Sequence, residues 1–574
     1  MDTAPTARQR ADQFVDRETQ FQLGYLPTEQ SNPLTADFHA TARRNTGEGV
    51  AQLFSVDRVM VELAKELLHS DEMDRLKHSV LRVLESDARI FFGGCGASGR
   101  MSVQLEAMWR RFFREASNKD PSQRDKLLRF ADKAGSVISG GELAVIQSVE
   151  YFEDHQTFGR QQVRDAGVGP KDLFITLGEA GIAWSTIGMA LEAEERKAET
   201  YFFYCNPRSV MEENLERCRL LFSRERICFI EAPFGPMAIT GSTRMQATSL
   251  ELVCVGYALE WALATWATEY TKLSIAALLS PNEYGNQIAD LVARISGPEA
   301  VASLARTVES EADAYRRGGI VTYFACKYLF DILADTTERT PTFALPPFPR
   351  FADSLARPSW AFAKNPFLPT QAAWEDLLQR PPIGLDWGSD TYEDLKAPPA
   401  LIDSPPNLSG SVCYEYAIGN EEDASRVSKH PALFVWVDVD CEITADTLRT
   451  SGGYDDLFGI HFGTGICTGH RFAVPFDQTS SPLSVSAHLA VKLAFNAIST
   501  TTAAVLDRIE GNWMVQVLPT NKKLIDRSIR ILSELRQLAY RDAAYLLFET
   551  WEGMPQGRGR SESPVAEALI GDRQ

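Results

Sequence analysis

The stretch FFGGCGASGRMSVQLEAMW, residues 91–109, passes from an apolar strand pattern through a cluster of glycines into a helix pattern. Within it, Gly94, Gly96 and Gly99 satisfy G-x-G-x-x-G, the spacing of a turn that binds a dinucleotide. Such a turn also needs an acidic residue about twenty positions further on, at the end of a second strand. Here that distance falls in the charged segment REASNKDPSQRDK, residues 114–126, so the sequence favours a different use of the turn.

Two other interpretations of this turn remain. The glycines can simply allow a tight turn and close packing of the strand against the helix, which explains Gly94 and Gly99. The turn can also be an anion site, because Ser98 lies at the helix start, where free N–H groups and the helix dipole attract a phosphate. A phosphomonoester suits such a site, and we predict that Gly96, Ala97, Ser98 and Gly99 contact it.

A second junction of the same kind lies at GPMAITGSTRMQATS, residues 235–249. Here Gly241, Ser242 and Thr243 precede a helix, and capping the helix is the commoner role of Ser or Thr at such a position. The carboxyl ends of parallel strands, however, meet at the edge of a sheet where α/β proteins bind ligands. We therefore expect Ser242 and Thr243 to share one site with the first turn.

Apolar strand patterns alternate with helical patterns through much of the chain. The strand patterns lie at residues 88–94, 172–178, 199–206, 226–232, 318–327 and 431–440. This alternation predicts the α/β class, with parallel sheets covered by helices on both faces. We expect an N-terminal helical segment (1–85), a first α/β domain (86–285), a second, degenerate one (286–483) with an irregular Pro-rich insertion (344–430), and a C-terminal helical region (484–574).

The composition is that of a globular protein and excludes several classes of partner. The net charge of −19 repels a polyanion, so we expect no nucleic-acid partner. The longest apolar stretch, residues 250–267, contains Glu251 and Glu260, which favours a buried helix over a membrane span. Nine cysteines without a C-x-x-C pair indicate reduced thiols in a cytoplasmic protein, with the nucleus as an alternative. We expect no metal ion and no other cofactor.

Several segments in one order resemble a known family, the sugar isomerase (SIS) family. The resemblance is to its branch that holds N-acetylmuramic acid 6-phosphate etherases and the glucokinase regulatory proteins. The segments are TEQSNP (28–33), GCGASGR (94–100), SVEYFED (148–154), YCNPRS (204–209), GPMAITGSTRM (235–245), FNAIST (495–500) and RIEGNWMVQVLPTNKKLIDR (508–527). The resemblance implies two three-layer SIS modules, because in the regulators a second module separates the GSTRM-type helix from the FNAIST-type block.

The second module is expected to complete the site of the first rather than to hold a phosphate itself. Where the glycine loop would fall, it has ACKYL, residues 325–329. In the etherases, a proton is removed from C2 and lactate leaves from C3, which requires carboxylates as general base and acid. The resemblance assigns one to Glu153; the other should lie at Met108, which cannot transfer a proton. DTTERTPTF (335–343) instead places Glu338 at that position, so Glu153 and Glu338 are the catalytic candidates if the protein is a lyase.

The loop TLGEAGIAWS, residues 176–185, departs from its relatives, which have hydroxyl side chains there. Gly181 is retained, but Glu179, Ala180 and Ala183 replace the expected hydroxyls, and a carboxylate near a phosphate lowers affinity unless a cation offsets it. The regulators direct basic residues at the sugar phosphate, which match Lys523 and Arg527 here. Arg100 and Arg244, after the two loops, are interpreted as members of structural ion pairs.

The resemblance favours a regulatory protein that binds a sugar phosphate over an etherase-like lyase. It implies a hexose or amino-sugar 6-phosphate as ligand, fructose 6-phosphate among them. The glutamates leave catalysis open, since the regulators use them to bind sugar hydroxyls. The partner that the resemblance implies is a sugar kinase of the hexokinase or glucokinase type, although the Pro-rich segment and the short C-terminal region differ from the animal regulators. The expected ligand-binding set is Gly96, Ala97, Ser98, Gly99, Glu153, Gly181, Ser242, Thr243, Glu338, Lys523 and Arg527.

Overall fold

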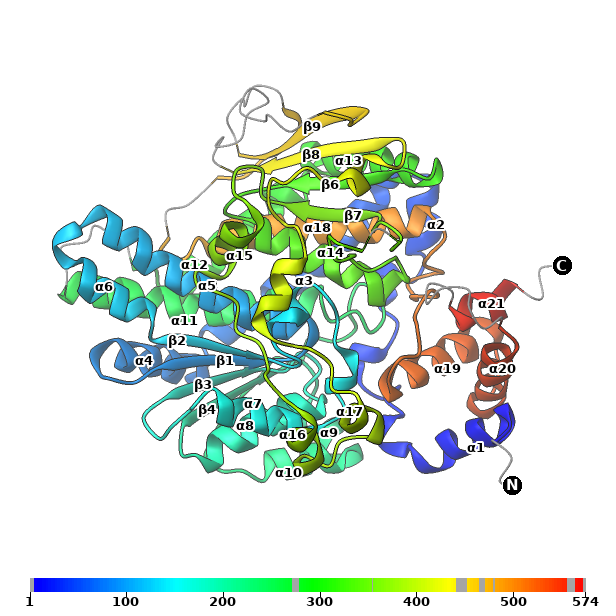
Figure 1. Cartoon of the computed structure of the whole chain (residues 1–574), viewed down its shortest axis with the longest axis horizontal. Helices are drawn as coiled ribbons and strands as arrows, with labels where there is room; N and C mark the ends of the chain where they lie inside the picture. The colour runs from blue at the N-terminus through cyan, green and yellow to red at the C-terminus, as the bar shows by residue number, and fades with distance from the viewer. Residues whose placement is uncertain are drawn as a thin grey trace.

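Two parallel β-sheets, each flanked by helices, organise the protein (Figure 1). A computed structural model describes residues 5–270, 278–353, 355–439, 452–463, 470–477, 481–554 and 563–570. The first sheet has the order β2-β1-β3-β4-β5, with every pairing parallel. Its strands are β1 (Ile90–Gly94), β2 (Ala134–Ile138), β3 (Leu173–Leu177), β4 (Glu199–Tyr204) and β5 (Ile227–Glu231). All residues of β1 and β3 are buried, which explains their continuous apolar runs.

The second sheet repeats the topology of the first. Its order is β10-β9-β8-β6-β7, again all parallel. The strands are β6 (Ile320–Phe324), β7 (Ala361–Lys364), β8 (Ala432–Asp438), β9 (Asp456–Phe462) and β10 (His470–Val474). Counted along the chain within each sheet, both sheets have the strand order 2-1-3-4-5. The predicted α/β class with two related modules is therefore confirmed.

The helices connect the strands and cover the sheets. Before the first sheet lie α1 (Ala7–Arg17), α2 (Phe38–Arg44), α3 (Thr46–Leu68) and α4 (Asp71–Glu85). Within and after it lie α5 (Gly96–Lys119), α6 (Arg124–Ala131), α7 (Gln156–Asp165), α8 (Trp184–Glu195), α9 (Arg208–Asn214), α10 (Glu216–Phe222) and α11 (Gln246–Tyr270). The second module contains α12 (Pro281–Ile295), α13 (Pro298–Arg316), α14 (Leu329–Phe343), α15 (Thr370–Leu378), α16 (Ser389–Asp394) and α17 (Pro399–Asp403). The C-terminal region contains α18 (Val485–Val505), α19 (Lys522–Arg536), α20 (Tyr540–Gly553) and α21 (Pro564–Ile570).

The expectation of an irregular Pro-rich segment is partly wrong. Residues 344–430 contribute an edge strand, β7, which pairs with β6, as well as three short helices. Arg380 in this segment is largely buried and forms ion pairs with Glu106 and Glu142 of the first module. The segment therefore belongs to the second sheet through β7 and also packs against the first module, which its many prolines did not predict.

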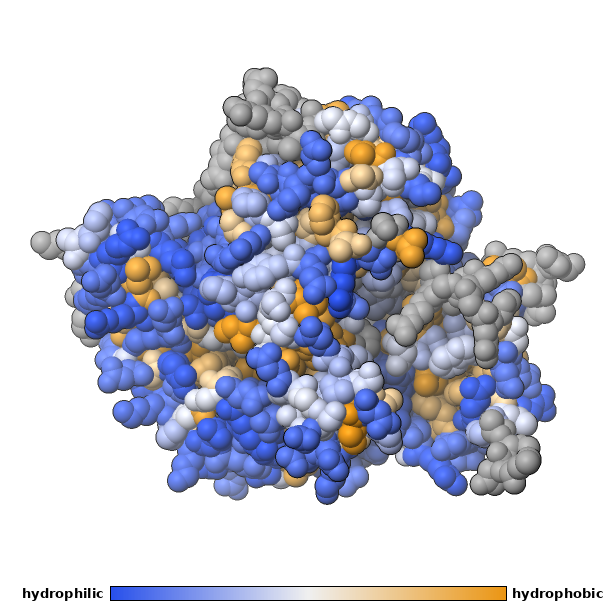
Figure 2. All heavy atoms as spheres, viewed as in Figure 1, coloured by the Kyte–Doolittle hydropathy of each residue, from blue (hydrophilic) through white to orange (hydrophobic). Residues whose placement is uncertain are grey.

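One hydrophobic core runs through both modules. Helices α5 and α11 of the first module pack against α14 and α18, so the modules share an interface made of helices. Helix α11 includes a stretch, Gln246–Thr268, that is long and apolar enough to span a membrane, but 94% of its most apolar window is buried inside the fold, as in a core helix. On the face shown in Figure 2, hydrophilic residues cover most of the surface and hydrophobic ones form small patches.

The C-terminal helices return to the N-terminus. Helices α19, α20 and α21 group with α1 at one side of the molecule, where both ends of the chain lie (Figure 1). The cap of α19 is Asn521, whose side chain accepts a hydrogen bond from Leu524 N at 2.8 Å. This helix carries Lys523 and Arg527 toward the first module.

Candidate functional site

A cavity of about 100 Å³ lies where the first module, the second module and α19 meet. We call it the intermodule pocket. Its lining residues are Cys95, Gly96, Ala97, Glu153, Leu177, Gly178, Glu179, Ala183, Thr186, Gly241, Ser242, Thr243, Arg244, Glu338, Pro341, Thr342, Met514, Lys523, Leu524 and Arg527. The pocket lies at the carboxyl ends of β1 and β3 and is also lined by the loop between β5 and α11; this is the edge at which parallel α/β sheets bind ligands.

The glycine turn supplies the N-terminus of α5. Gly96 has φ +57°, a conformation that favours glycine, and it directs the first turn of the helix into the pocket. The amides of Gly96 and Ala97 have no carbonyl partner within the helix, because the first N–H groups of any α-helix lack one. Ser98 is buried, its hydroxyl donates to the Glu251 carboxylate at 2.6 and 2.7 Å, and its amide donates to Glu179 Oε1 at 3.0 Å.

The second junction adds hydroxyl groups beside these amides. Gly241 has φ +72°, a conformation that favours glycine, and the guanidinium of Arg527 lies close to its Cα. Thr243 Oγ1 donates to Glu179 Oε2 at 2.6 Å. The Ser242 side chain is 5% exposed, and its hydroxyl has no hydrogen-bond partner in the described part of the chain. We call the amides of Gly96, Ala97 and Ser98 with the hydroxyls of Ser242 and Thr243 the anion cradle.

The two candidate carboxylates line the same pocket from different modules. Glu153 follows the short helix η6 (Glu150–Phe152), and its Oε1 accepts from Lys523 Nζ at 2.6 Å. Glu338 lies on α14 and forms an ion pair with the buried Arg100 of α5. One carboxylate from each module thus lines the same pocket, as the sequence predicts, and each is already paired to a cation.

The remaining cations of the pocket are also paired. Arg527 Nη2 contacts the buried Glu29 at 2.5 Å, and Arg530 contacts the same carboxylate at 2.6 Å. Although burial opposes the charge of Glu29, the two guanidinium groups outweigh it and lower the pKa of Glu29 to about 2. Arg244 pairs with Asp335 at 2.8 Å. Arg100 and Arg244 thus both form the ion pairs expected from sequence, and Arg244 also lines the pocket.

The structure brings most of the expected ligand-binding residues together. Lining the pocket are Gly96, Ala97, Glu153, Ser242, Thr243, Glu338, Lys523 and Arg527. Three others do not line it: the Ser98 hydroxyl points to Glu251, Gly99 packs against Ile138, and Gly181 packs against Met211 and Tyr204. Sequence reasoning did not assign Glu29 or Glu251 to the site, although Glu29 falls within the TEQSNP segment.

Met108 and Glu106 lie away from the pocket. Met108 is 5% exposed and belongs to the hydrophobic core. Glu106, two residues earlier on α5, is buried with Arg110, Arg380 and Ser136. Neither residue can act on a ligand in the pocket, so α5 contributes no carboxylate to it.

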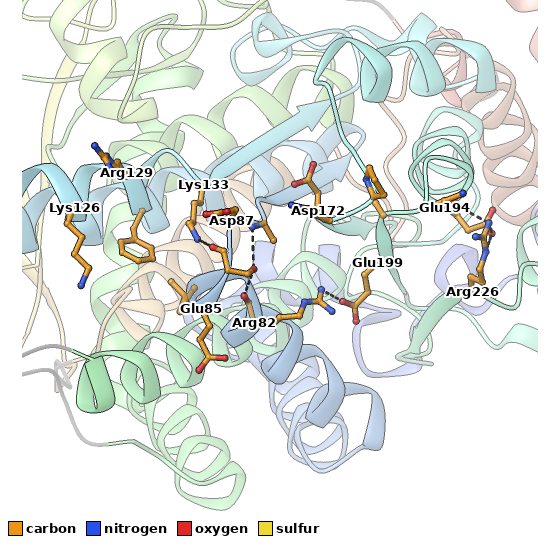
Figure 3. A pocket seen from close by; sticks show the side chains of 18 residues that line it. Arg82, Glu85, Asp87, Lys126, Arg129, Lys133, Asp172, Glu194, Glu199 and Arg226 are labelled. Atoms are coloured by element: carbon orange, nitrogen blue, oxygen red, sulfur yellow. Dashed lines mark hydrogen bonds and ion pairs between the residues drawn. The ribbon is translucent and has the colours of Figure 1, made fainter.

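A larger hollow, of about 1110 Å³, lies at the opposite edge of the first sheet (Figure 3). It is formed by the amino ends of the strands and the end of α4. Its Arg82 pairs with Glu199 and its Arg226 with Glu194, while Lys133 donates to the Val83 carbonyl. Because parallel sheets bind ligands at their carboxyl edge, the smaller intermodule pocket is the better candidate.

Comparisons with known proteins show what parts of the chain are similar to. Residues 73–184 match the family model described as the glucokinase regulatory protein N-terminal SIS domain. N-acetylmuramic acid 6-phosphate etherase of Salmonella typhi is 27% identical over 256 residues, which cover 44% of this chain and 75% of the relative. N-acetylmuramic acid 6-phosphate etherase 1 of Bacillus licheniformis is 23% identical over 275 residues, 48% of this chain and 81% of the relative.

Among solved structures, tagatose-6-phosphate ketose/aldose isomerase from Escherichia coli aligns with a TM-score of 0.40 and 11% identity, covering 84% of this chain and 99% of that one. The C-terminal domain of glucosamine-fructose-6-phosphate aminotransferase from Francisella tularensis aligns with a TM-score of 0.39 and 11% identity, covering 78% and 96%. Part of the chain is therefore similar to the SIS domain of glucokinase regulatory proteins and to N-acetylmuramic acid 6-phosphate etherases.

Proposed function

We propose that this protein binds a hexose or amino-sugar 6-phosphate in the intermodule pocket and acts as a regulatory sensor rather than as an enzyme. The observation that carries the proposal is the state of the two carboxylates. A general acid has to donate a proton, whereas Glu153 and Glu338 each accept from a cation, Lys523 and Arg100 respectively. With Met108 in the core, carboxylates in this state suit hydrogen bonds to sugar hydroxyls better than proton transfer.

The ligand is proposed to lie with its phosphate at the anion cradle and its sugar ring toward Glu153 and Glu338. A thermal-shift measurement with fructose 6-phosphate and other hexose 6-phosphates tests this. Since a ligand that binds the native state stabilises it by RT ln(1 + [L]/Kd), the melting temperature should rise with concentration. No rise with any hexose or amino-sugar phosphate at millimolar concentration would contradict the proposal.

A sugar kinase of the hexokinase or glucokinase type is the partner included in this proposal, together with a cytoplasmic location. The purified protein should inhibit such a kinase, and the sugar phosphate should change the degree of inhibition. Kinase activity that stays unchanged in the presence of an excess of the protein, with and without sugar phosphate, would remove the kinase from the proposal.

An etherase-like lyase is the second candidate, because Glu153 and Glu338 line one cavity and the curated relatives are named as etherases. The purified protein would then release lactate from N-acetylmuramic acid 6-phosphate, and Glu153→Gln would abolish the release. If lactate stays at background, this candidate fails and the regulatory one is favoured.

A further inference from the structure

The side chain of Glu179 occupies part of the anion cradle. Its carboxylate accepts from the Ser98 amide at 3.0 Å and from Thr243 Oγ1 at 2.6 Å. One donor is at a helix N-terminus and the other is a hydroxyl, which is the donor set that binds a phosphate in an α/β protein. The carboxylate therefore holds two of the donors that a ligand phosphate would need.

The backbone fixes Glu179 in this orientation. Its φ is +44°, which is uncommon for a residue with a side chain. Its amide donates to Glu251 Oε1 at 3.0 Å, and its carbonyl accepts from Cys205 N at 2.6 Å. The orientation toward the cradle is thus supported from the loop and from α11.

No cation forms an ion pair with this carboxylate among the described residues, and Lys523 acts on it only from across the pocket. Neither Glu179 nor Glu251 forms an ion pair in the described part of the chain, and the pocket's own cations are bound to Glu153, Glu29 and Asp335. Burial raises the pKa of both Glu179 and Glu251, and their mutual repulsion raises that of Glu251 further. The titratable or charged groups that act on Glu179 are Glu153, Glu338 and Lys523 across the pocket, Glu251 on α11 and Cys205 after β4.

The donors that remain are enough to begin binding. The amides of Gly96 and Ala97 and the Ser242 hydroxyl line the pocket without a partner in the described residues. Ser242 is also buried, with only 5% of its surface exposed. A phosphate placed on these groups would lie next to the Glu179 carboxylate, and two anions in such a site repel each other.

We propose that Glu179 is an internal competitor for the ligand phosphate, so that it determines the affinity of this pocket for phosphorylated sugars and weakens that affinity as pH rises. This inference rests on the proposed function, in which the ligand is a sugar phosphate. A phosphate binds fully when Glu179 is neutral or has left Ser98 and Thr243. Glu179 is thus a specificity-determining residue, and it acts against the phosphate group and not against the sugar.

The test compares the full-length wild type with Glu179→Gln, which keeps the shape and removes the charge. The exposed Glu213→Gln on α9 is the matched control. The probes are fructose 6-phosphate and a hexose 6-sulfate, whose charge does not change between pH 6 and pH 8. Calorimetric titration is done at both pH values. At pH 8, Glu179→Gln should bind both probes about tenfold more tightly than the wild type does, since removing a repulsion equivalent to one pKa unit lowers the dissociation constant about tenfold.

The sulfate ester isolates the titration of the protein from that of the ligand. The wild type and Glu213→Gln should bind it several-fold more tightly at pH 6 than at pH 8, while Glu179→Gln should show little change. Binding by Glu179→Gln alone would also support the inference.

Equal affinities of wild type and Glu179→Gln would overturn the inference and leave the proposed function standing. Weaker binding by Glu179→Gln would do the same, because Glu179 would then be a ligand contact. Absence of sugar-phosphate binding by both proteins would overturn both. If Glu179→Gln does not fold, the pH dependence of the wild type with the sulfate ester decides, and a flat dependence counts against the inference.

Discussion

Replacement of Glu29 by Gln tests how α19 is held at the pocket. Glu29 is 1% exposed and binds both Arg527 and Arg530. Its pKa of about 2 lies below the ordinary value of 4.5, and this depression corresponds to about 3 kcal/mol of stability at neutral pH. Because the folded-state pKa is lowered, this stability is present above pH 4.5 and is lost as pH falls toward 2. Glu29→Gln should therefore cost about 3 kcal/mol at pH 7, and by pH 3.5 the difference from wild type should shrink by about 1 kcal/mol.

Hydrogen exchange followed by mass spectrometry measures this locally. Protection factors of peptides from α19 should fall on the order of 100-fold at pH 7 in Glu29→Gln, since each 1.4 kcal/mol is a factor of ten. Glu62→Gln, which removes an exposed ion pair with Lys65, is the control and should change protection by less than about threefold. A loss below about 1 kcal/mol in α19, or a difference that does not shrink toward acidic pH, would refute the reasoning.

Two further outcomes follow from other contacts. Arg380→Ala leaves Glu106 and Glu142 without their shared cation, so unfolding at pH 7 should become easier by about 3–5 kcal/mol. Because burial raises the pKa of Glu142, the loss of stability should be smaller at pH 5 than at pH 7. Denaturant midpoints of wild type and variant at both pH values measure this, and an equal loss at pH 5 and pH 7 would contradict it. Ser242→Ala should weaken fructose 6-phosphate binding about tenfold, because a hydrogen bond to a charged group is lost. The melting temperature of the ligand-free protein should stay unchanged. A lower melting temperature with unchanged affinity would count against the place of Ser242 in the anion cradle.

The first sheet could be predicted from sequence to the extent that its strands are buried on both faces. Strands β1, β3 and β4 are mostly apolar and almost entirely buried, as expected for a parallel sheet under helices. Strand β2 reads AGSVI and is half-exposed at its middle, so its pattern is weak. Strand β7 is four residues long at a sheet edge and is surrounded by prolines. Edge strands pack on fewer sides, and their sequences are correspondingly less constrained.

The residues of the pocket were more predictable than the contacts they make. Family segments identified the two hydroxyl-bearing junctions and both glutamates, which line one cavity. The partner of Arg527, however, lies 498 residues away in sequence, and nothing local indicates that Glu29 holds it. The direction of Glu179 depends on a backbone angle of +44°, which no residue pattern predicts.

Under the proposed function, the charge arrangement of the pocket explains why one loop residue, Glu179, would control the affinity for the phosphate. Lys523, Arg527 and Arg244 are each bound to a carboxylate of the protein, so none of them meets a ligand phosphate as an uncompensated charge. Recognition of the phosphate then depends on neutral donors, namely the first amides of α5 and the hydroxyls of Ser242 and Thr243. Neutral donors attract an anion through dipoles, whose energy is modest compared with the repulsion from a nearby full charge. The Glu179 carboxylate supplies that charge within hydrogen-bonding distance of the Ser98 amide and the Thr243 hydroxyl, so removing it should raise phosphate affinity about as much as the loss of one donor, such as the Ser242 hydroxyl, lowers it.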